Sequence, residues 1–341
     1  MAARARIGDG RGGHPSGMPA PSPPGRPARR RRPGSADPAI ALRGLTKRYG
    51  RRAALVDVDL DVRRGEVFGF IGPNGAGKTT AIRLLLDLIR PTAGTARVLG
   101  LDPRRDGVAV RRRVGYLPGE LALYEDLTAR ELLAYVAALR DGRGRDVEPL
   151  AERLALELDR PIRTLSKGSK QKVGLIQAFA HAPELLILDE PTGGLDPLVQ
   201  HVFAQMLDEA RERGQTVFLS SHVLSEVERL ADRVGIVRDG RLLVVDDVGA
   251  LKARLPRRLE LRFDGAPPAG AFAGLDGVAA VERDGAHVTL ALDGPADAAL
   301  KAAARYRVLT VASREPDLDD LFLDLLGDGP DARQHPRQDA A

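Results

Sequence analysis

A glycine-rich segment that contains one lysine and ends in threonine carries the clearest chemical signal in the chain. It consists of Gly72, Pro73, Asn74, Gly75, Ala76, Gly77, Lys78 and Thr79, with Thr80 directly after it. This pattern, G-x-x-x-x-G-K-[ST], points backbone N–H groups at a phosphate chain, and the helix that follows adds a positive dipole. We expect Lys78 to bridge the β- and γ-phosphate oxygens and the Thr79 hydroxyl to bind Mg²⁺. The segment therefore predicts a site for a nucleoside triphosphate.

Two carboxylates at the end of an apolar run supply the second signal. Leu185–Leu188 are four aliphatic residues, and Asp189 and Glu190 follow them directly. On its own, this pattern is a strand that ends in an acidic turn. Beside the strand that enters the phosphate loop, however, Asp189 would hold Mg²⁺ through water, and Glu190 would accept a proton from the attacking water. Together the two segments predict hydrolysis of a bound nucleotide.

The elements that must position these residues indicate an α/β fold. Short apolar runs typical of buried parallel strands lie at Glu66–Ile71, Glu184–Asp189 and Thr216–Ser220. Helical spacing separates them, at Thr80–Ile89 and Val199–Arg213. This alternation predicts a doubly wound α/β sheet, and the phosphate loop beside it indicates a P-loop NTPase.

Further patterns suggest how the chain is divided. Residues 117–180 have mostly helical patterns and predict a helical subdomain, and Asp239-Gly240 predicts a hairpin turn. We expect one ATPase domain over residues 39–250. Short strand and helix patterns after Pro256, the last of them a helix over Leu318–Leu326, predict a small α+β appendix over residues 256–327.

Positive charge is concentrated at the start of the chain. The net charge is +5, yet residues 1–38 contain eight Arg and two Asp and carry +6, which leaves the remainder at −1. That segment is rich in Pro and Gly, so we expect a disordered tail there and another over residues 328–341. A nearly neutral remainder offers little for nucleic acid to bind, so no nucleic acid is expected as a partner. The absence of Cys excludes disulfides and thiolate zinc sites, and no apolar run is long enough to span a membrane.

Five motifs, in order, resemble the nucleotide-binding subunit of ATP-binding-cassette (ABC) transporters over about residues 39–250. They are Tyr49, the phosphate loop, the signature-like Leu165–Gln171, the acidic strand with a D-loop at Leu195-Asp196, and the switch-like His222. Tyr49 lies where the family stacks an aromatic ring on adenine. The resemblance implies ATP and Mg²⁺ as cofactors, and a head-to-tail homodimer with two ATP molecules between its subunits.

In such a dimer both subunits would build each site. One subunit would supply Lys78, Thr79, Asp189, Glu190 and His222, and the other Ser166 and Gly168. The Ser166 hydroxyl and the N–H groups of the helix that begins there would complete the cage around the γ-phosphate. Asp196 would lie near the facing site, although it could also cap the helix after Pro197.

The sequence departs from the family pattern in two places. Gly119 stands where the family usually has Gln, and glycine cannot ligate Mg²⁺ or orient water through a side chain. Either Glu120 takes over that role or the site works without it. In the signature, Lys167 and Ser169 stand where Gly and Gln are usual, and Lys167 brings a positive charge close to the phosphate contact.

The end of the chain narrows the resemblance. Residues 311–328 resemble the last helix of bacterial drug- and antibiotic-exporter (ABC-2) ATPases, although they also read as an amphipathic helix that packs on its own subdomain. The resemblance implies the ATP-hydrolysing subunit of a two-component exporter. Such a subunit would lie peripherally at the cytoplasmic face of the cell membrane and energise a separate transmembrane permease.

Two other functions remain open. A cassette ATPase that acts on nucleic acid or on ribosomes would need a long coiled-coil insertion or a second cassette. Only 86 residues separate Lys78 from Leu165, and one cassette is found. A regulatory ATP binder without turnover is the other alternative, suggested by Gly119.

Overall fold

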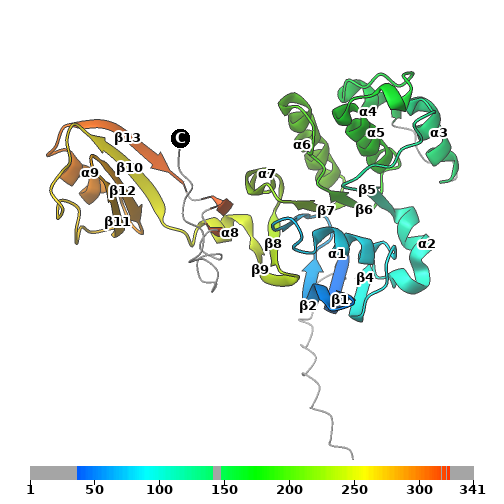
Figure 1. Ribbon diagram of the computed structural model, residues 1–341, viewed down its shortest axis with the longest axis horizontal. Helices are drawn as coiled ribbons and strands as arrows, with labels where there is room; N and C mark the ends of the chain where they lie inside the picture. Colours follow the sequence, from blue (N-terminus) through cyan, green and yellow to red (C-terminus); the bar gives the residue numbers. More distant parts are fainter. Residues whose placement is uncertain (1–36, 141–146, 316, 320, 323–341) are drawn as a thin grey trace, which may run out of the picture. The chain divides into compact units, whose positions relative to one another are not determined.

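A computed structural model of the chain describes residues 37–140, 147–315, 317–319 and 321–322. Apart from Asp37 and Pro38, both predicted tails lie outside these residues. Within the described ranges, no helix combines the length and the hydrophobicity needed to cross a membrane. Three sheets carry the structure of this part of the chain (Figure 1).

A six-stranded sheet, in the order β5-β6-β7-β3-β8-β9, forms the centre. Its strands are β3 (Val67–Ile71), β5 (Val114–Leu117), β6 (Leu185–Asp189), β7 (Thr216–Ser221), β8 (Arg233–Arg238) and β9 (Arg241–Asp247). The first five in the order are parallel, and β9 returns antiparallel to β8 through the predicted turn at Asp239-Gly240. Every residue of β3 and β6 is buried, as expected for strands covered on both faces. The predicted doubly wound α/β sheet is confirmed.

A smaller antiparallel sheet, in the order β2-β1-β4, covers part of the first. It consists of β1 (Ile40–Tyr49), β2 (Arg52–Val62) and β4 (Ala93–Val98). Its inward side chains share one apolar cluster with Phe68, Phe70 and Phe218 of the central sheet. The rings of Phe68 and Phe218 stack with their centroids 5.9 Å apart. This cluster also encloses Ile82 and Leu85 of the helix that follows the phosphate loop, and so fixes the start of that helix.

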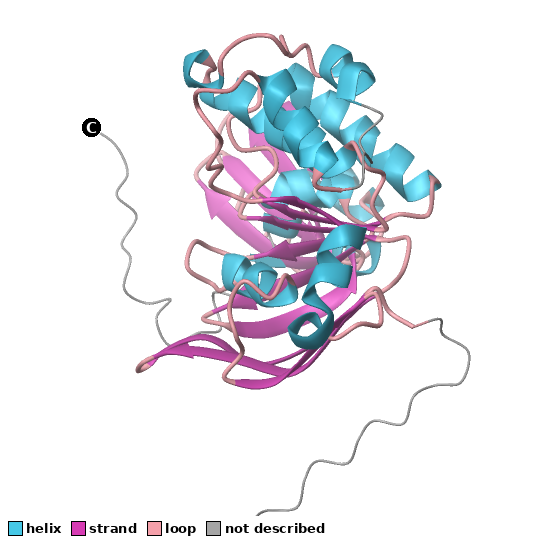
Figure 2. Ribbon diagram, turned by 90° about the vertical axis from the view of Figure 1, so that its right-hand side faces the viewer, coloured by secondary structure: helices cyan, strands magenta, loops and turns pink. Residues whose placement is uncertain are grey.

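Helices pack against the strands in layers (Figure 2). They are α1 (Lys78–Leu85), α2 (Pro103–Arg113), α3 (Ala129–Ala138), α4 (Val147–Arg153), the 3₁₀ turn Ile162–Thr164, α5 (Lys167–Phe179), α6 (Pro197–Glu212), α7 (Leu224–Leu230) and α8 (Val248–Lys252). Helices α3 and α4 both contact α5, and these three helices form the predicted helical subdomain. Helix α1 is shorter than the predicted Thr80–Ile89, because Asp87 has a positive φ of 57° that helical backbone cannot accommodate.

The C-terminal part has its own sheet, in the order β11-β12-β10-β13. Its elements are β10 (Arg257–Phe263), β11 (Val278–Asp284), β12 (His287–Leu292), α9 (Asp297–Ala303) and β13 (Val308–Arg314). Phe263 and Phe272 lie in its separate apolar cluster, which agrees with the predicted α+β appendix. Of the predicted helix Leu318–Leu326, only residues 318, 319, 321 and 322 are described, and these are helical. Leu318 is buried in the apolar cluster of the ATPase part, and its N–H donates to Glu228 of α7 at 3.0 Å. The expectation that this helix packs on its own subdomain is therefore wrong for the described residues, because its apolar side chains complete the core beside α7.

Candidate functional site

The phosphate loop connects β3 to α1 and is shaped by its glycines. A Cβ on Gly72 would lie 2.1 Å from the carbonyl oxygen of Val237. A Cβ on Gly77 would lie 2.4 Å from the carbonyl oxygen of Ala54, and Gly77 has a φ of +109°. Neither position can accept a side chain without backbone movement. The loop therefore keeps its backbone close to β2 and β8, and α1 begins directly at Lys78.

Lys78 is held inside this loop. Its side chain is only 6% exposed, and its Nζ donates to the carbonyl oxygens of Gly72 at 2.7 Å and Pro73 at 3.3 Å. The same Nζ lies 3.4 Å from Oε1 of Glu190. The structure thus brings together the two residues that the sequence predicts to contact the γ-phosphate and the attacking water.

The acidic strand end lies at the carboxyl edge of the central sheet. In the parallel register Asp189 on β6 is opposite Ser220 on β7, and Ser221 is opposite Ile71, where β3 enters the loop. Asp189 is 1% exposed, and its Oδ1 accepts a 2.5 Å hydrogen bond from the Ser220 hydroxyl. Ser220 was not among the predicted site residues. A polar pair that ends the apolar strand TVFLSS was the signal available.

Glu190 makes contacts on two sides. Its Oε2 lies 2.8 Å from Nδ1 of His222, whereas Lys78 lies beside Oε1, so the predicted switch histidine reaches the predicted base. The backbone of Glu190 is left-handed, with a φ of +50°, which is uncommon for a residue other than glycine. After it, the Thr192 hydroxyl donates to Glu226 of α7 at 2.5 Å, a link between the turn and that helix that the sequence did not suggest.

The loop after β5 brings Gly119 against the carboxylate of Asp189. A Cβ on Gly119 would lie 3.4 Å from Oδ2 of Asp189, at ordinary contact distance. Glu120, the predicted substitute, is exposed. Burial and the charge of Asp189 raise the pKa of Tyr116, which precedes this loop. Position 119 therefore faces the predicted metal ligand, but in this chain it offers no side chain.

The remaining predicted residues lie at helix starts or on the surface. Ser166 is the N-cap of α5, where its Oγ accepts from the N–H of Ser169 at 3.1 Å. Gly168 packs tightly, since a Cβ there would lie 2.6 Å from the carbonyl oxygen of Gly194. Asp196 caps α6 by accepting from the N–H of Val199 at 3.0 Å, so the capping alternative is confirmed. Tyr49 is 47% exposed, with the ammonium of Lys47 4.9 Å from its ring centroid.

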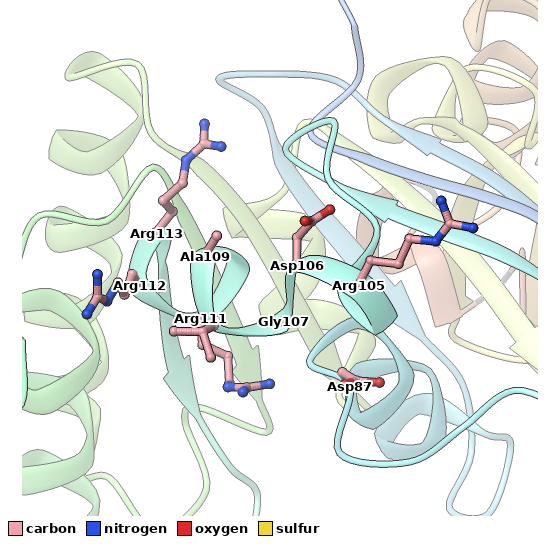
Figure 3. A pocket seen from close by; sticks show the side chains of 9 residues that line it. Asp87, Arg105, Asp106, Gly107, Ala109, Arg111, Arg112 and Arg113 are labelled. Atoms are coloured by element: carbon pink, nitrogen blue, oxygen red, sulfur yellow. The ribbon is translucent and has the colours of Figure 1, made fainter.

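A separate hollow of about 700 Å³ lies along α2 (Figure 3). Arginines line much of it, and their side chains point in different directions instead of converging. Arg113 is paired with Glu184 at 2.5 Å, and Arg111 donates to the carbonyl oxygen of Leu86 at 3.2 Å. None of the predicted catalytic residues lines this hollow, so the candidate site is the edge that holds Lys78 and Glu190.

Comparison with known proteins agrees with this geometry. The model of the ABC transporter family matches residues 55–193. The bacitracin transport ATP-binding protein BcrA of Bacillus licheniformis is 39% identical over 228 residues, which cover 66% of this chain and 74% of that protein. A fluoroquinolones export ATP-binding protein of Mycobacterium tuberculosis is 35% identical over 84% of this chain and 93% of its own length. The daunorubicin resistance ATP-binding protein DrrA3 of Streptomyces coeruleorubidus is 37% identical over 86% and 97%.

Solved structures give the same result for the fold. An ATP-binding subunit of an ABC transporter has a TM-score of 0.59 and 33% identity, over 63% of this chain and 92% of that one. A dimeric bacterial ABC transporter cassette has a TM-score of 0.56 and 25% identity, over 61% and 98%. With the phosphate loop, the acidic strand and the histidine brought together at one sheet edge, these likenesses show that the chain belongs to the ABC transporter family, as an ATP-binding subunit with ATPase activity.

Proposed function

We propose that the chain is the ATP-hydrolysing subunit of a two-component exporter for drug- or antibiotic-like molecules. One observation carries the hydrolytic part of this proposal: Glu190 is held between Lys78, 3.4 Å away, and His222, 2.8 Å away. The names of relatives that match most of the chain, which refer to fluoroquinolone export and daunorubicin resistance, support the exporter part. Cassettes that act on nucleic acid or ribosomes have no comparable support among these relatives.

In the proposed reaction, Glu190 takes a proton from the water that attacks the γ-phosphate. Lys78 and His222 contact the γ-phosphate, and the loop from Gly72 to Thr80 surrounds the phosphate chain. Tyr49 stacks on the adenine. The contact of Lys78 with Glu190 supports these roles, because a γ-phosphate bound by Lys78 has the base beside it.

Mg²⁺ fits the oxygen atoms at this edge. Asp189 is buried, its Oδ1 is oriented by Ser220, and its Oδ2 faces the space beside Gly119. Thr79, exposed at the first turn of α1, adds a hydroxyl oxygen. Oxygen ligands of this kind suit Mg²⁺. When bound, the ion would neutralise charge on the β- and γ-phosphate oxygens.

The assembly is part of the proposal. Two copies would meet head to tail, so that Ser166 and Gly168 of one copy complete the site of the other, with Asp196 nearby. The chain would bind a separate transmembrane permease from the cytoplasmic face, peripherally. Within the chain, residues 39–250 would form the ATPase domain and residues 256–327 an accessory domain. A solved relative is a dimeric ABC transporter cassette, and BcrA is named a transport ATP-binding protein, which supports this arrangement.

Glu190→Gln tests the hydrolytic mechanism. The amide cannot accept the proton, so we expect ATPase turnover to fall about 100-fold or more while ATP binding persists. The trapped ATP should also convert the variant to a dimer, measured by light scattering with and without ATP. Glu184→Gln, at the opposite end of β6, is the matched control and should keep its turnover. Unchanged ATPase activity in Glu190→Gln would overturn the role of Glu190.

A further inference from the structure

Gln171 is a buried polar residue of α5, and it contacts the two carbonyl oxygens that directly follow the Cα of Glu190. It is 6% exposed, and the other buried residues of this helix include the apolar Val173 and Leu175. Its Nε2 donates to the carbonyl oxygen of Pro191 at 3.0 Å and also lies 3.4 Å from that of Glu190. A buried amide is retained at a cost unless it is hydrogen-bonded, and these carbonyls are its partners.

The peptide that Gln171 contacts needs support. Glu190 has a φ of +50°, a backbone conformation that is unfavourable for a side chain with a Cβ. Its N–H donates to the carbonyl oxygen of Ser220 at 3.1 Å, and its own carbonyl accepts from Gly193 at 3.2 Å. Two helices also reach this turn: α5 through Gln171, and α7 through Glu226, which accepts from the Thr192 hydroxyl. Together these bonds maintain a conformation that the local sequence alone disfavours.

The position of the carboxylate depends on this backbone. The side chain of Glu190 reaches both Lys78 and His222 from one rotamer, and a shift of its Cα would break one or both contacts. For a general base, displacement of about 1 Å can cost about 100-fold in rate. Gln171 therefore affects the rate of hydrolysis by fixing where the carboxylate of Glu190 lies.

Helix α5 gives this contact a second consequence. Its N-cap Ser166 is proposed to meet the nucleotide of the facing subunit, and Gln171 lies five residues further along the same rigid helix. We propose that Gln171 is a positioning residue that fixes the backbone of Glu190 and thereby links the partner's nucleotide, through α5, to this subunit's own base. The inference rests on the proposed function.

Gln171→Glu tests this role with almost no change in shape. A carboxylate lacks the N–H donors, so it would repel the two carbonyl oxygens instead of binding them. We expect kcat to fall about 10-fold or more at about pH 8, with unchanged affinity for a fluorescent ATP analogue, since the hydrogen bonds of the Gln171 side chain go to Glu190 and Pro191 and not to the phosphate loop. Burial beside carbonyls favours the protonated acid, whose O–H can donate. The ratio of variant to wild-type kcat should therefore rise as the pH falls.

Gln215→Glu is the matched control. Gln215 is also buried, and its amide donates to the carbonyl oxygen of a proline, Pro183, but it lies at the opposite end of β6 and β7 from the site. We expect this variant to lose stability without a change in kcat per folded molecule or in its pH dependence. Gln171→Met, which fills the same space without a donor, should lose kcat and show no recovery at low pH.

The outcomes separate the two proposals. If the wild-type protein hydrolyses ATP but Gln171→Glu and Gln171→Met keep their kcat, the positioning role is wrong. It is equally wrong if the Gln215 control changes kcat and its pH profile as much as Gln171→Glu does. If wild-type protein binds ATP without hydrolysing it, the proposed function fails, independently of Gln171.

Discussion

Glu190 is the residue on which three distant parts of the chain converge. Lys78 approaches it from the phosphate loop, His222 from the end of β7, and Gln171 from α5. The ammonium of Lys78 lies 3.4 Å from Oε1 of Glu190, so a γ-phosphate bound by Lys78 would lie beside the proposed base.

Gly119→Gln restores the side chain that the family usually has at this position and that this chain lacks. The space at position 119 faces Oδ2 of Asp189, and the Cβ of a substituted residue fits at 3.4 Å. An amide oxygen there would give the divalent ion one more ligand. We expect the ADP-bound variant to bind Mn²⁺ several-fold more tightly, measured by electron paramagnetic resonance. Gly119→Ala adds the Cβ without the oxygen and should match wild type; equal gains in both variants would contradict a ligand role.

At the scale of elements, the ends of α3 and α5 meet β5 through a charged contact. Arg140, just after α3, donates from NH1 to the carbonyl oxygen of Val114 at 3.3 Å and lies 2.5 Å from Nε2 of His181, just after α5. A guanidinium can only donate, so Nε2 must accept and the ring is neutral. Burial, followed by the charge of Arg140, lowers the pKa of His181 to about 4.

This pKa predicts how stability depends on pH. The pKa of this histidine in the unfolded chain is about 6.5, above its folded value of about 4. Between these two pH values the unfolded chain therefore binds more protons than the folded chain. The contribution of His181 is fully present above about pH 6.5 and is lost as the pH falls toward 4. We expect the urea midpoint to fall between about pH 7.5 and pH 5, and His181→Gln to reduce that fall. The exposed His201→Gln is the control, and an equal fall in all three proteins would show the assignment to be wrong.

At the scale of the whole molecule, the predicted site and the predicted tail are separate parts of the sequence. All candidate site residues lie at Tyr49 or later, whereas residues 1–38 carry a charge of +6. Deletion of residues 1–38 should leave ATPase turnover within about twofold of wild type. It should also weaken binding to vesicles that contain anionic lipid, measured by sedimentation. Substitution of Arg29–Arg32 by Ser in the full chain tests whether charge alone is responsible, since it should weaken vesicle binding in the same way. A large loss of turnover on deletion would contradict this division.

The sequence by itself determined the phosphate loop, the acidic strand end and the alternating α/β order. These signals are local: glycines, one lysine and short apolar runs report their structure within a few residues. The same holds for the hairpin at Asp239-Gly240 and for the cap at Asp196, where the neighbouring residues alone favour the observed geometry.

Only the tertiary structure decided which residues hold Asp189 and Glu190 in place. Gln171, Ser220 and the Thr192–Glu226 pair reach the site through the order of strands in the sheet and the packing of α5 and α7. Such contacts join residues distant in the chain, and a buried glutamine or serine resembles any other polar residue until its partner is known. The sequence identified the groups that do chemistry, whereas packing between distant elements decided how they are held, because a hydrogen bond depends on positions in space that no local pattern records.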